Sequence, residues 1–187
     1  MTDTLNDKKI LILSTNYGTE TSELTSPLSY LKEHGAQVTV AAPSTDPIAT
    51  LEGDKDPGEK VTPDATLSDV RAADYDAVVV PGGTINADTL RTDSDAQALV
   101  KSFADDGKVV AMICHAPWLL VDSGLAKGKT LTSYHSIAAD LRNAGATWVD
   151  QEVKVCPGNG YRLITSRQPD DLDAFNSTIE ETLTAQA

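Results

Sequence analysis

The sequence has few cysteines, few aromatic residues and no long apolar stretch. Its 187 residues include two cysteines, and aromatic residues make up 5% of the chain. Because two cysteines cannot build a disulfide framework, we expect a reducing compartment in which a thiol stays available for chemistry. The longest apolar segment, residues 109–121, is interrupted by His115 and Pro117 and is too short to span a bilayer. The composition therefore argues against a disulfide-rich secreted protein and against a membrane protein.

Basic residues are also scarce. Lys and Arg number 15 against 28 Asp and Glu, which gives a formal net charge of -13. Because such a surface repels phosphate backbones, we expect no nucleic acid partner. The three histidines show no metal-ligand spacing with one another or with the cysteines, so we expect no metal and no other cofactor. Residues 1–9 are polar and do not resemble a secretory signal, so we expect the protein in the cytoplasm.

The chain is long enough for one substantial core. It is 40% hydrophobic, and no shift in composition divides it, so we expect a single domain over residues 1–187. Short segments that are apolar at successive positions predict strands covered on both faces, as in a parallel sheet. These segments are residues 10–13, 77–80 and 108–113. A fourth strand, residues 37–42, follows a helical segment, residues 28–34, that Gly35 ends.

The remaining segments predict helices and one hairpin. Helical spacing occurs in residues 94–106, 119–125, 137–144 and 172–183. Residues 147–155 and 161–165 are joined by Pro-Gly-Asn-Gly at 157–160, which is the turn chemistry of a hairpin. Residues 43–63 are rich in proline, glycine and acids and predict a surface loop. The order predicts an α/β fold, a three-layer α/β/α sandwich with a mainly parallel sheet and a late antiparallel hairpin.

A nucleophile elbow is predicted where residues 108–113 end at Cys114. The Cys is followed by His115, the small Ala116 and Pro117, a pattern typical of a strand that turns sharply into a helix. In such a turn the free N–H groups of the helix favour a thiolate, so we expect a lowered thiol pKa. The alternative is an inert core cysteine, which is the commoner fate of a Cys that closes an apolar strand.

Three loops should meet at the carboxyl edge of this sheet. They are residues 16–23, 82–88 and 114–116, each of which follows a predicted strand. Gly82 and Gly83 allow the backbone to come close to a ligand or to the elbow. The pair either binds an oxyanion or forms a tight turn and nothing more. A pocket with Cys114 at its base is therefore expected.

The chain resembles the PfpI family, the branch of the class I glutamine amidotransferase-like superfamily that contains intracellular-protease-like and deglycase-like proteins. The resemblance covers nearly the whole chain and rests on five motifs. These are Val80-Pro81-Gly82-Gly83, Ile113-Cys114-His115-Ala116-Pro117, Thr132-Ser133-Tyr134, residues 143–150 and residues 163–172. It implies a flavodoxin-like fold, a homodimer or higher homo-oligomer, and a stress-related role in the cytoplasm.

The resemblance also implies roles for particular residues. Cys114 matches the nucleophile and His115 its neighbour, while Glu23 matches the acid that touches the sulfur; Glu20 is the rival candidate, expected to be a solvated turn carboxylate. Gly82, Gly83 and Ala116 match the substrate and oxyanion-binding positions. Asp88 matches the acid that orients the histidine across a subunit interface, although Ala87 shares that neighbourhood. His135 is expected on an exposed loop, and Cys156 is expected to be non-catalytic.

Two kinds of function fit these residues. A thiolate beside a histidine attacks carbonyl carbons, which suits a glyoxalase or deglycase acting on a small carbonyl substrate or its protein adduct, and equally a hydrolase or peptidase. An accessible thiolate is also what a peroxide sensor needs. A holdase chaperone is a third possibility and would require an exposed apolar patch.

Overall fold

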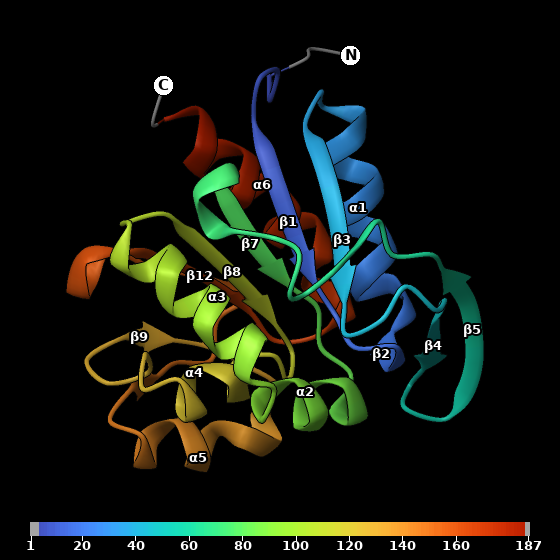
Figure 1. Ribbon diagram of the computed structural model, residues 1–187. Helices are drawn as coiled ribbons and strands as arrows, with labels where there is room; N and C mark the ends of the chain where they lie inside the picture. The colour runs from blue at the N-terminus through green and yellow to red at the C-terminus, as the bar shows by residue number, and fades with distance from the viewer. Residues whose placement is uncertain (1–3, 186–187) are drawn as a thin grey trace.

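The core of the molecule is a seven-stranded sheet, which runs through the centre of Figure 1. The computed structural model describes residues 4–185. In spatial order the strands are β11 (Val153–Cys156), β12 (Arg162–Ser166), β8 (Val109–Ile113), β7 (Ala77–Val80), β1 (Lys9–Leu13), β3 (Gln37–Ala42) and β6 (Ala65–Thr66). Every neighbouring pair is parallel except β11 and β12, which are antiparallel. The predicted strands and the late antiparallel hairpin are therefore confirmed.

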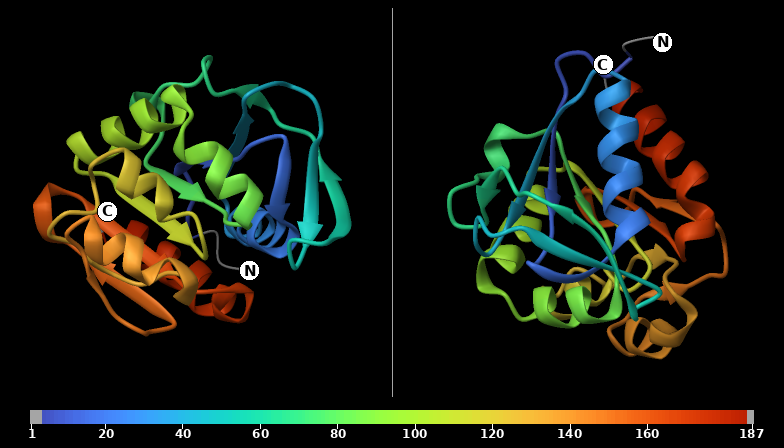
Figure 2. Two further views of the ribbon diagram at one scale, coloured as in Figure 1. Left: turned by 90° about the horizontal axis from the view of Figure 1, so that it is seen from below. Right: turned by 90° about the vertical axis from the view of Figure 1, so that its right-hand side faces the viewer.

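Alternate side chains of each strand pack into two separate cores. Ile10 and Ile12 join the core under α1 (Thr21–Glu33) and α6 (Leu172–Thr184), whereas Leu11 and Leu13 point to the opposite face. That second face is covered mainly by α3 (Ser94–Asp105) and α4 (Trp118–Asp122). Figure 2 shows α1 and α6 together on one side of the sheet. The fold is thus a flavodoxin-like α/β/α sandwich, as predicted.

Most predicted helices are present within a few residues of their expected bounds. The remaining helices are α2 (Thr84–Arg91) and α5 (Ala138–Asn143), with short 3-10 turns η1 (Ala72–Asp74), η2 (His135–Ile137), η3 (Gly158–Gly160) and η4 (Pro169–Asp171). The largest difference is α1, which begins at Thr21, seven positions before the expected Leu28. The Thr21 hydroxyl bonds Thr50 and the Leu51 carbonyl, so contacts from a distant strand, rather than local apolar spacing, fix this start. Glu23 consequently lies inside the first turn of α1.

The prediction of a surface loop over residues 43–63 is wrong. The segment contains β4 (Ile48–Glu52) and β5 (Asp56–Val61), which form a three-stranded sheet with β2 (Tyr17–Glu20). Gly53 and Asp54 both have positive φ, 61° and 59°, and the Lys55 N–H bonds the Glu52 carbonyl, which together make the turn that favours hairpins. The polar composition hid the strands because β5 is largely exposed, whereas Ile48 and Leu51 of β4 are buried.

A two-stranded parallel sheet lies beside the main one. It joins β9 (Thr130–Leu131) to β10 (Thr147–Trp148). The segment expected as one strand over residues 147–155 is therefore divided between β10 and β11. Within residues 4–185, no helix is long and apolar enough to cross a membrane.

Candidate active site

Cys114 lies on a strained turn at the carboxyl end of β8. Its φ is 64°, a left-handed conformation that non-glycine residues rarely adopt and that costs of order 1–3 kcal/mol. The turn is held because the Cys114 N–H donates to the Ser166 carbonyl of β12 and its carbonyl accepts the Tyr134 N–H. The side chain is 7% exposed. This geometry confirms the predicted elbow, although α4 starts only at Trp118, after an intervening turn.

The His115 ring is in hydrogen-bond contact with the sulfur. Its Nδ1 atom lies 3.1 Å from Cys114 Sγ, and its Nε2 atom lies 3.2 Å from Ser136 Oγ. The ring is stacked on Tyr134 with 4.8 Å between centroids and is flanked by Trp118. Burial lowers the pKa of His115, so the imidazole is neutral at pH 7 and can accept a proton.

Glu23 places a carboxyl group beneath the sulfur. Its Oε2 atom accepts the Gly82 N–H at 2.8 Å, and the carboxyl interacts with the Cys114 thiol. Among the residues that the structure describes, Oε1 has no hydrogen-bond partner. Glu20 also lines the pocket, but it accepts the Gly53 N–H at 2.9 Å instead of contacting the sulfur. The structure therefore favours Glu23 over Glu20 as the acid at the cysteine.

The Cys114 thiol and the Glu23 carboxyl form a coupled pair that carries one negative charge at most near neutral pH. Burial raises the pKa of Glu23 to about 8, so it keeps its proton. Burial also raises the pKa of Cys114, and an ionised Glu23 would raise it further, whereas the N–H groups of Gly83 and His115 lower it. The expectation of a lowered thiol pKa left out burial, which is the largest effect. The first proton that leaves belongs to the pair, not to one residue.

The three oxyanion candidates have different roles from those expected. The Gly82 N–H is taken by Glu23, and the Ala116 N–H donates to the Ile113 carbonyl. The assignment of these two amides to an oxyanion site is therefore wrong. Gly82 instead supplies room, because a Cβ there would lie 2.7 Å from Cys114 Cβ. Gly83 alone, of the three, lines the pocket and directs its N–H at the sulfur.

A cavity of about 490 Å³ opens above Cys114. Its lining combines the elbow with the β4–β5 turn and several aromatic or hydroxyl side chains. The lining residues are Glu20, Glu23, Gly53, Asp54, Gly83, Thr84, Cys114, His115, Trp118, Tyr134, Ser136 and Pro169. Asp54, Thr84 and Ser136 were not predicted as site residues. Asp54 lies in residues 43–63, which the sequence predicted to be a surface loop. The Gly53-Asp54 pair was the sequence signal for that turn.

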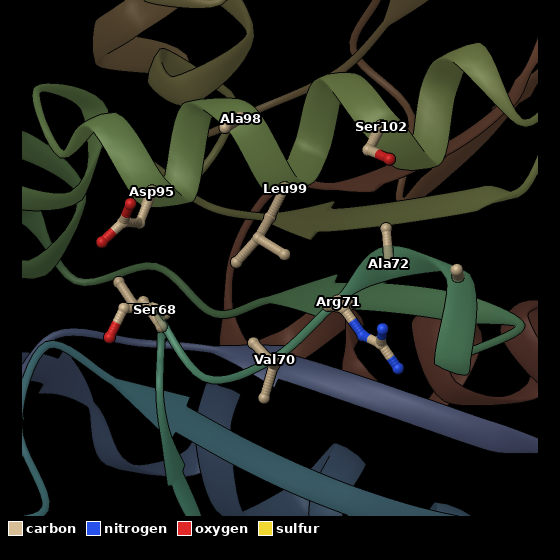
Figure 3. Close-up of a pocket in the computed structure, with 10 residues that line it drawn as sticks. Ser68, Val70, Arg71, Ala72, Asp95, Ala98, Leu99 and Ser102 are labelled. Carbon is tan, nitrogen blue, oxygen red and sulfur yellow. The ribbon is translucent and has the colours of Figure 1, made fainter.

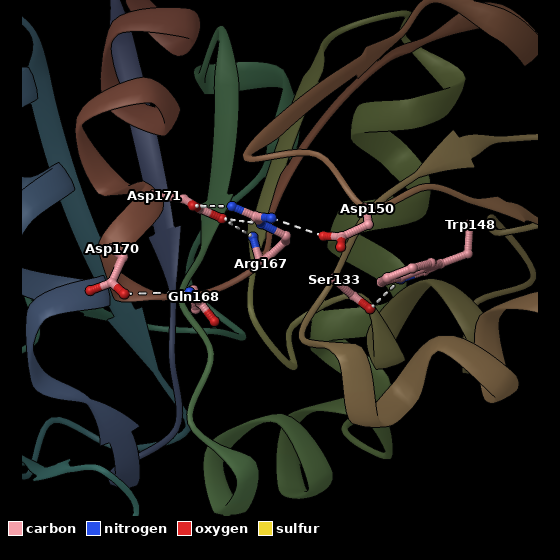
Figure 4. Close-up of polar contacts among 7 residues, drawn as sticks. All are labelled: Ser133, Trp148, Asp150, Arg167, Gln168, Asp170 and Asp171. Atoms are coloured by element: carbon pink, nitrogen blue, oxygen red, sulfur yellow. Dashed lines mark hydrogen bonds and ion pairs between the residues drawn. The ribbon is translucent and has the colours of Figure 1, made fainter.

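A network of polar contacts holds two walls of the cavity in place (Figure 4). Arg167 pairs with Asp171 at 2.9 Å and with Asp150 at 2.8 Å, which fixes the chain on either side of Pro169. The Trp148 indole N–H donates to Ser133 Oγ, and the Ser133 hydroxyl in turn donates to the Tyr134 carbonyl. The stacking partner of His115 is thereby anchored from outside the pocket.

Three predicted residues lie outside this cavity. Asp88 is on the exposed side of α2 and does not line the pocket, so the role expected of it across a subunit interface stays a prediction. His135 is exposed and stacks on Tyr134, as expected of a loop histidine. Cys156 is buried at the end of β11, where its sulfur accepts the Thr130 N–H. Within residues 4–185, no group of three or more His, Cys, Asp and Glu side chains could hold a metal ion.

A second hollow, of about 310 Å³, lies between α3 and the segment that leads into η1. Figure 3 shows Leu99 of α3 directed toward the segment that carries Val70 and Arg71. Its lining contains neither a cysteine nor a histidine. It therefore does not combine a thiol with an imidazole, as the cavity above Cys114 does.

The fold and the site define an α/β protein with a cysteine on a strained turn at the carboxyl edge of its parallel sheet. The pattern of the DJ-1/PfpI family matches residues 8–182, and the chain belongs to this family. It is 42% identical over 169 residues to general stress protein 18 of Bacillus subtilis, with 90% of this chain and 94% of that protein covered. It is 39% identical over 170 residues to protein/nucleic acid deglycase 2 of Escherichia coli, with the same two coverages.

A solved structure supports the same assignment. The crystal structure of DJ-1beta from Drosophila melanogaster superposes with a TM-score of 0.83 at 33% sequence identity, and the match covers 95% of this chain and 90% of that one. The resemblance inferred from the motifs is thus confirmed at the level of family and fold.

Proposed function

We propose that the protein is a cysteine-dependent enzyme that acts on small carbonyl compounds such as glyoxals, or on the early adducts that these form on proteins. The observation that carries the proposal is the position of the Cys114 sulfur at the base of an open cavity, 3.1 Å from a neutral imidazole and against a protonated carboxyl. A relative named a deglycase supports this class of substrate.

The site supplies each group that addition to an aldehyde requires. The thiol proton moves to His115 Nδ1, and the sulfur forms a bond to the carbonyl carbon while the π electrons move to oxygen. That oxygen takes the proton from His115 and becomes the hydroxyl of a hemithioacetal. The Gly83 N–H stabilises the negative charge on sulfur before attack, and a protonated Glu23 carboxyl adds a second donor to it. His115 is then placed to move the proton of the next step.

The lining of the cavity favours an uncharged substrate. It contains the acids Glu20, Glu23 and Asp54, and none of the described residues that line it is a lysine or an arginine. A carboxylate or phosphate on the substrate would meet no cation here. Trp118 and Tyr134 provide apolar surface for the carbon skeleton instead. A small dicarbonyl satisfies both conditions.

A peroxide sensor is the second candidate, and one observation favours it. The unpartnered Oε1 atom of Glu23 is buried beside the sulfur, where a protonated carboxyl would donate to an oxygen of a Cys114 sulfinate. This role needs the same thiolate but no turnover. Hydrolysis of peptides has less support, because the amides of Gly82 and Ala116 are not free to stabilise a tetrahedral oxyanion.

Measuring methylglyoxal consumption separates these functions. We expect turnover by the wild-type protein and by Cys156→Ala, none by Cys114→Ala, and a marked loss in His115→Ala. A sensor would instead form the sulfinate stoichiometrically with mild peroxide and consume methylglyoxal no faster than a free thiol of equal pKa. Background consumption by the wild-type protein would contradict the enzymatic proposal for glyoxals.

We also propose that the protein acts as a homo-oligomer in the cytoplasm during stress. A relative named a general stress protein supports the last point. Tyr17 and Ile85 are exposed large apolar side chains at the junction of β2 and α2, where Ile85 lies against Gly18. Light scattering of the purified chain tests the oligomeric state, and a monomer at micromolar concentration would contradict it.

A further inference from the structure

A series of hydrogen-bonding groups leads from the β4–β5 turn to Cys114. Asp54 accepts the Thr84 backbone N–H through Oδ1 at 2.8 Å and the Thr84 hydroxyl through Oδ2 at 2.5 Å. Thr84 Oγ1 lies 3.5 Å from His115 Nε2. On the other side of the imidazole, Nδ1 lies 3.1 Å from Cys114 Sγ. Side chains from three separate segments of the polypeptide are therefore connected through the imidazole ring of His115.

The hydrogen bonds of Thr84 favour one arrangement of protons. A carboxylate accepts and does not donate, so the single hydroxyl proton of Thr84 points to Asp54. Toward His115, at 3.5 Å, the same oxygen can then only accept, which favours a proton on Nε2. A neutral imidazole carries one N–H, so Nδ1 presents its lone pair to the thiol of Cys114.

The other neighbours of the ring do not decide its tautomer. Ser136 Oγ lies 3.2 Å from Nε2, and its free hydroxyl rotor can either donate or accept. Tyr134 and Trp118 contact the faces and edge of the ring and fix its orientation, not its protons. Asp54 is thus the group that favours a proton on Nε2 over a proton on Nδ1.

The turn that carries Asp54 is itself fastened to the site. The Gly53 N–H donates to Glu20 Oε2 at 2.9 Å, and Asp54 has a φ of 59°. A left-handed aspartate is unusual, and here it aims the carboxylate at the first turn of α2. The backbone of the β4–β5 hairpin therefore fixes the position of Asp54.

We propose that Asp54 is a positioning residue that acts through Thr84 to hold His115 with its proton on Nε2, so that Nδ1 takes the proton of the Cys114 thiol. When that proton moves from Sγ to Nδ1, the imidazolium donates on both sides, and the Asp54 charge stabilises it through Thr84. The role of Asp54 in catalysis rests on the proposed function, but the tautomer of His115 does not. An acid that orients the histidine then comes from the same chain.

Nitrogen NMR of ring-labelled histidine tests the tautomer directly. In the wild-type protein at neutral pH we expect a pyrrole-type Nε2 and a pyridine-type Nδ1 for His115. Thr84→Val should abolish this single tautomer, and Thr84→Ser should keep it because the hydroxyl is retained. Asp56→Asn is the matched control on the same hairpin, since its exposed side chain makes no contact with the pocket, and it should give the wild-type spectrum.

Asp54→Asn gives the sharpest contrast. Its amide oxygen still accepts the Thr84 N–H, but its NH₂ group donates to the hydroxyl, which frees the hydroxyl proton for Nε2. The proton of His115 should therefore move to Nδ1. A wild-type protein with its proton on Nδ1, or variants Thr84→Val and Asp54→Asn with wild-type shifts, would overturn the proposal.

Kinetics separate this inference from the proposed function. For methylglyoxal, Thr84→Val should lower kcat by about tenfold, less than the roughly 10²–10⁴-fold of general acid–base catalysis because His115 itself remains, with little change in KM and with recovery in Thr84→Ser. If the wild-type protein has the Nε2–H tautomer but no turnover, the tautomer inference stands and the proposed function fails. Turnover with kcat unchanged in Thr84→Val would overturn the positioning role.

Discussion

At the scale of single residues, the chemistry depends on where one proton and one charge are placed. Cys114 and Glu23 are both buried, so the pair carries one negative charge at most near neutral pH. The N–H groups of Gly83 and His115 favour that charge on the sulfur, against the burial that raises the pKa of Cys114. The carboxyl then serves as a donor, which is a role that an exposed acid could not fill.

Exchanging the acids one at a time tests this division of roles. Glu23→Leu removes the donor to the sulfur, so alkylation of Cys114 at neutral pH should slow by at least about tenfold, since a charged hydrogen bond contributes about 1.5–3 kcal/mol. Glu20→Leu should change the rate by less than about twofold, which is ~0.4 kcal/mol. Alkylation rates of both variants in a Cys156→Ala background provide the comparison. Equal effects from the two substitutions would contradict the assignment of Glu23.

The buried carboxyl should also make stability depend on pH. The pKa of Glu23 is raised from 4.5 to about 8, so between these values the folded protein holds a proton that the unfolded chain has released. The contribution of Glu23 is complete below pH 4.5 and declines by about 1.4 kcal/mol per pH unit toward pH 8.

The variant Glu23→Gln has no such proton. Its free energy of unfolding, measured by urea titration at pH 5, 6 and 7, should therefore rise relative to that of the wild-type protein by about 1.4 kcal/mol per pH unit. Taking the difference between the two proteins removes the titration of all other groups. Parallel pH curves for the two proteins would mean that Glu23 is ionised in the folded state.

At the scale of elements, the site depends on two backbone segments that come unusually close. The loop after β7 passes over the elbow at Gly82, where an added Cβ would lie 2.5 Å from Glu23 Oε2 and 2.7 Å from Cys114 Cβ. No L side chain fits in that space. The loop and the elbow are thereby held at the distance that brings the carboxyl under the sulfur.

Gly82→Ala tests this close approach. The methyl group should force the loop from the elbow, destabilise the protein by about 1–3 kcal/mol and slow the alkylation of Cys114. Gly124→Ala is the control, because its φ of 75° strains an alanine backbone but nothing lies within 4 Å of the new Cβ. It should cost about 1 kcal/mol and leave the alkylation rate unchanged. A Gly82→Ala protein with the wild-type alkylation rate would contradict this account.

Local patterns predicted the elements of the core well and those of the site less completely. The apolar runs of β1, β7 and β8 were decisive because both of their faces are buried. The sequence did not predict the β4–β5 hairpin because β5 is polar and exposed. In addition, β4 pairs with β2, which is distant in sequence. Cys114 and His115 stand together in one motif and were found, whereas Asp54 reaches them only through this hairpin.

At the scale of the whole molecule, charge should govern which substrates enter. The chain carries a formal net charge of -13, and no lysine or arginine is among the described residues that line the cavity. The negative field of the surface therefore continues into the site. An anionic aldehyde should be excluded even where it is small enough to fit.

Methylglyoxal and glyoxylate provide a test of this exclusion. Both are small aldehydes, but glyoxylate carries a carboxylate, so its kcat/KM should be lower by at least about tenfold, corresponding to ~1.4 kcal/mol of repulsion. Glu20→Gln should narrow the difference, and added salt should narrow it as well. Equal kcat/KM values at low salt would contradict the electrostatic account of the cavity.

The covalent bond between Cys114 and a carbonyl carbon is the central claim, and peptide mass spectrometry measures it most directly. The protein would be treated briefly with isotope-labelled methylglyoxal, quenched in acid so that hemithioacetals do not reverse, and digested at low pH. We predict label on the peptide that contains Cys114 in the wild-type and Cys156→Ala proteins, and its loss in Cys114→Ala. Label found equally on Cys156 and on surface lysines, with no preference for Cys114, would contradict the account.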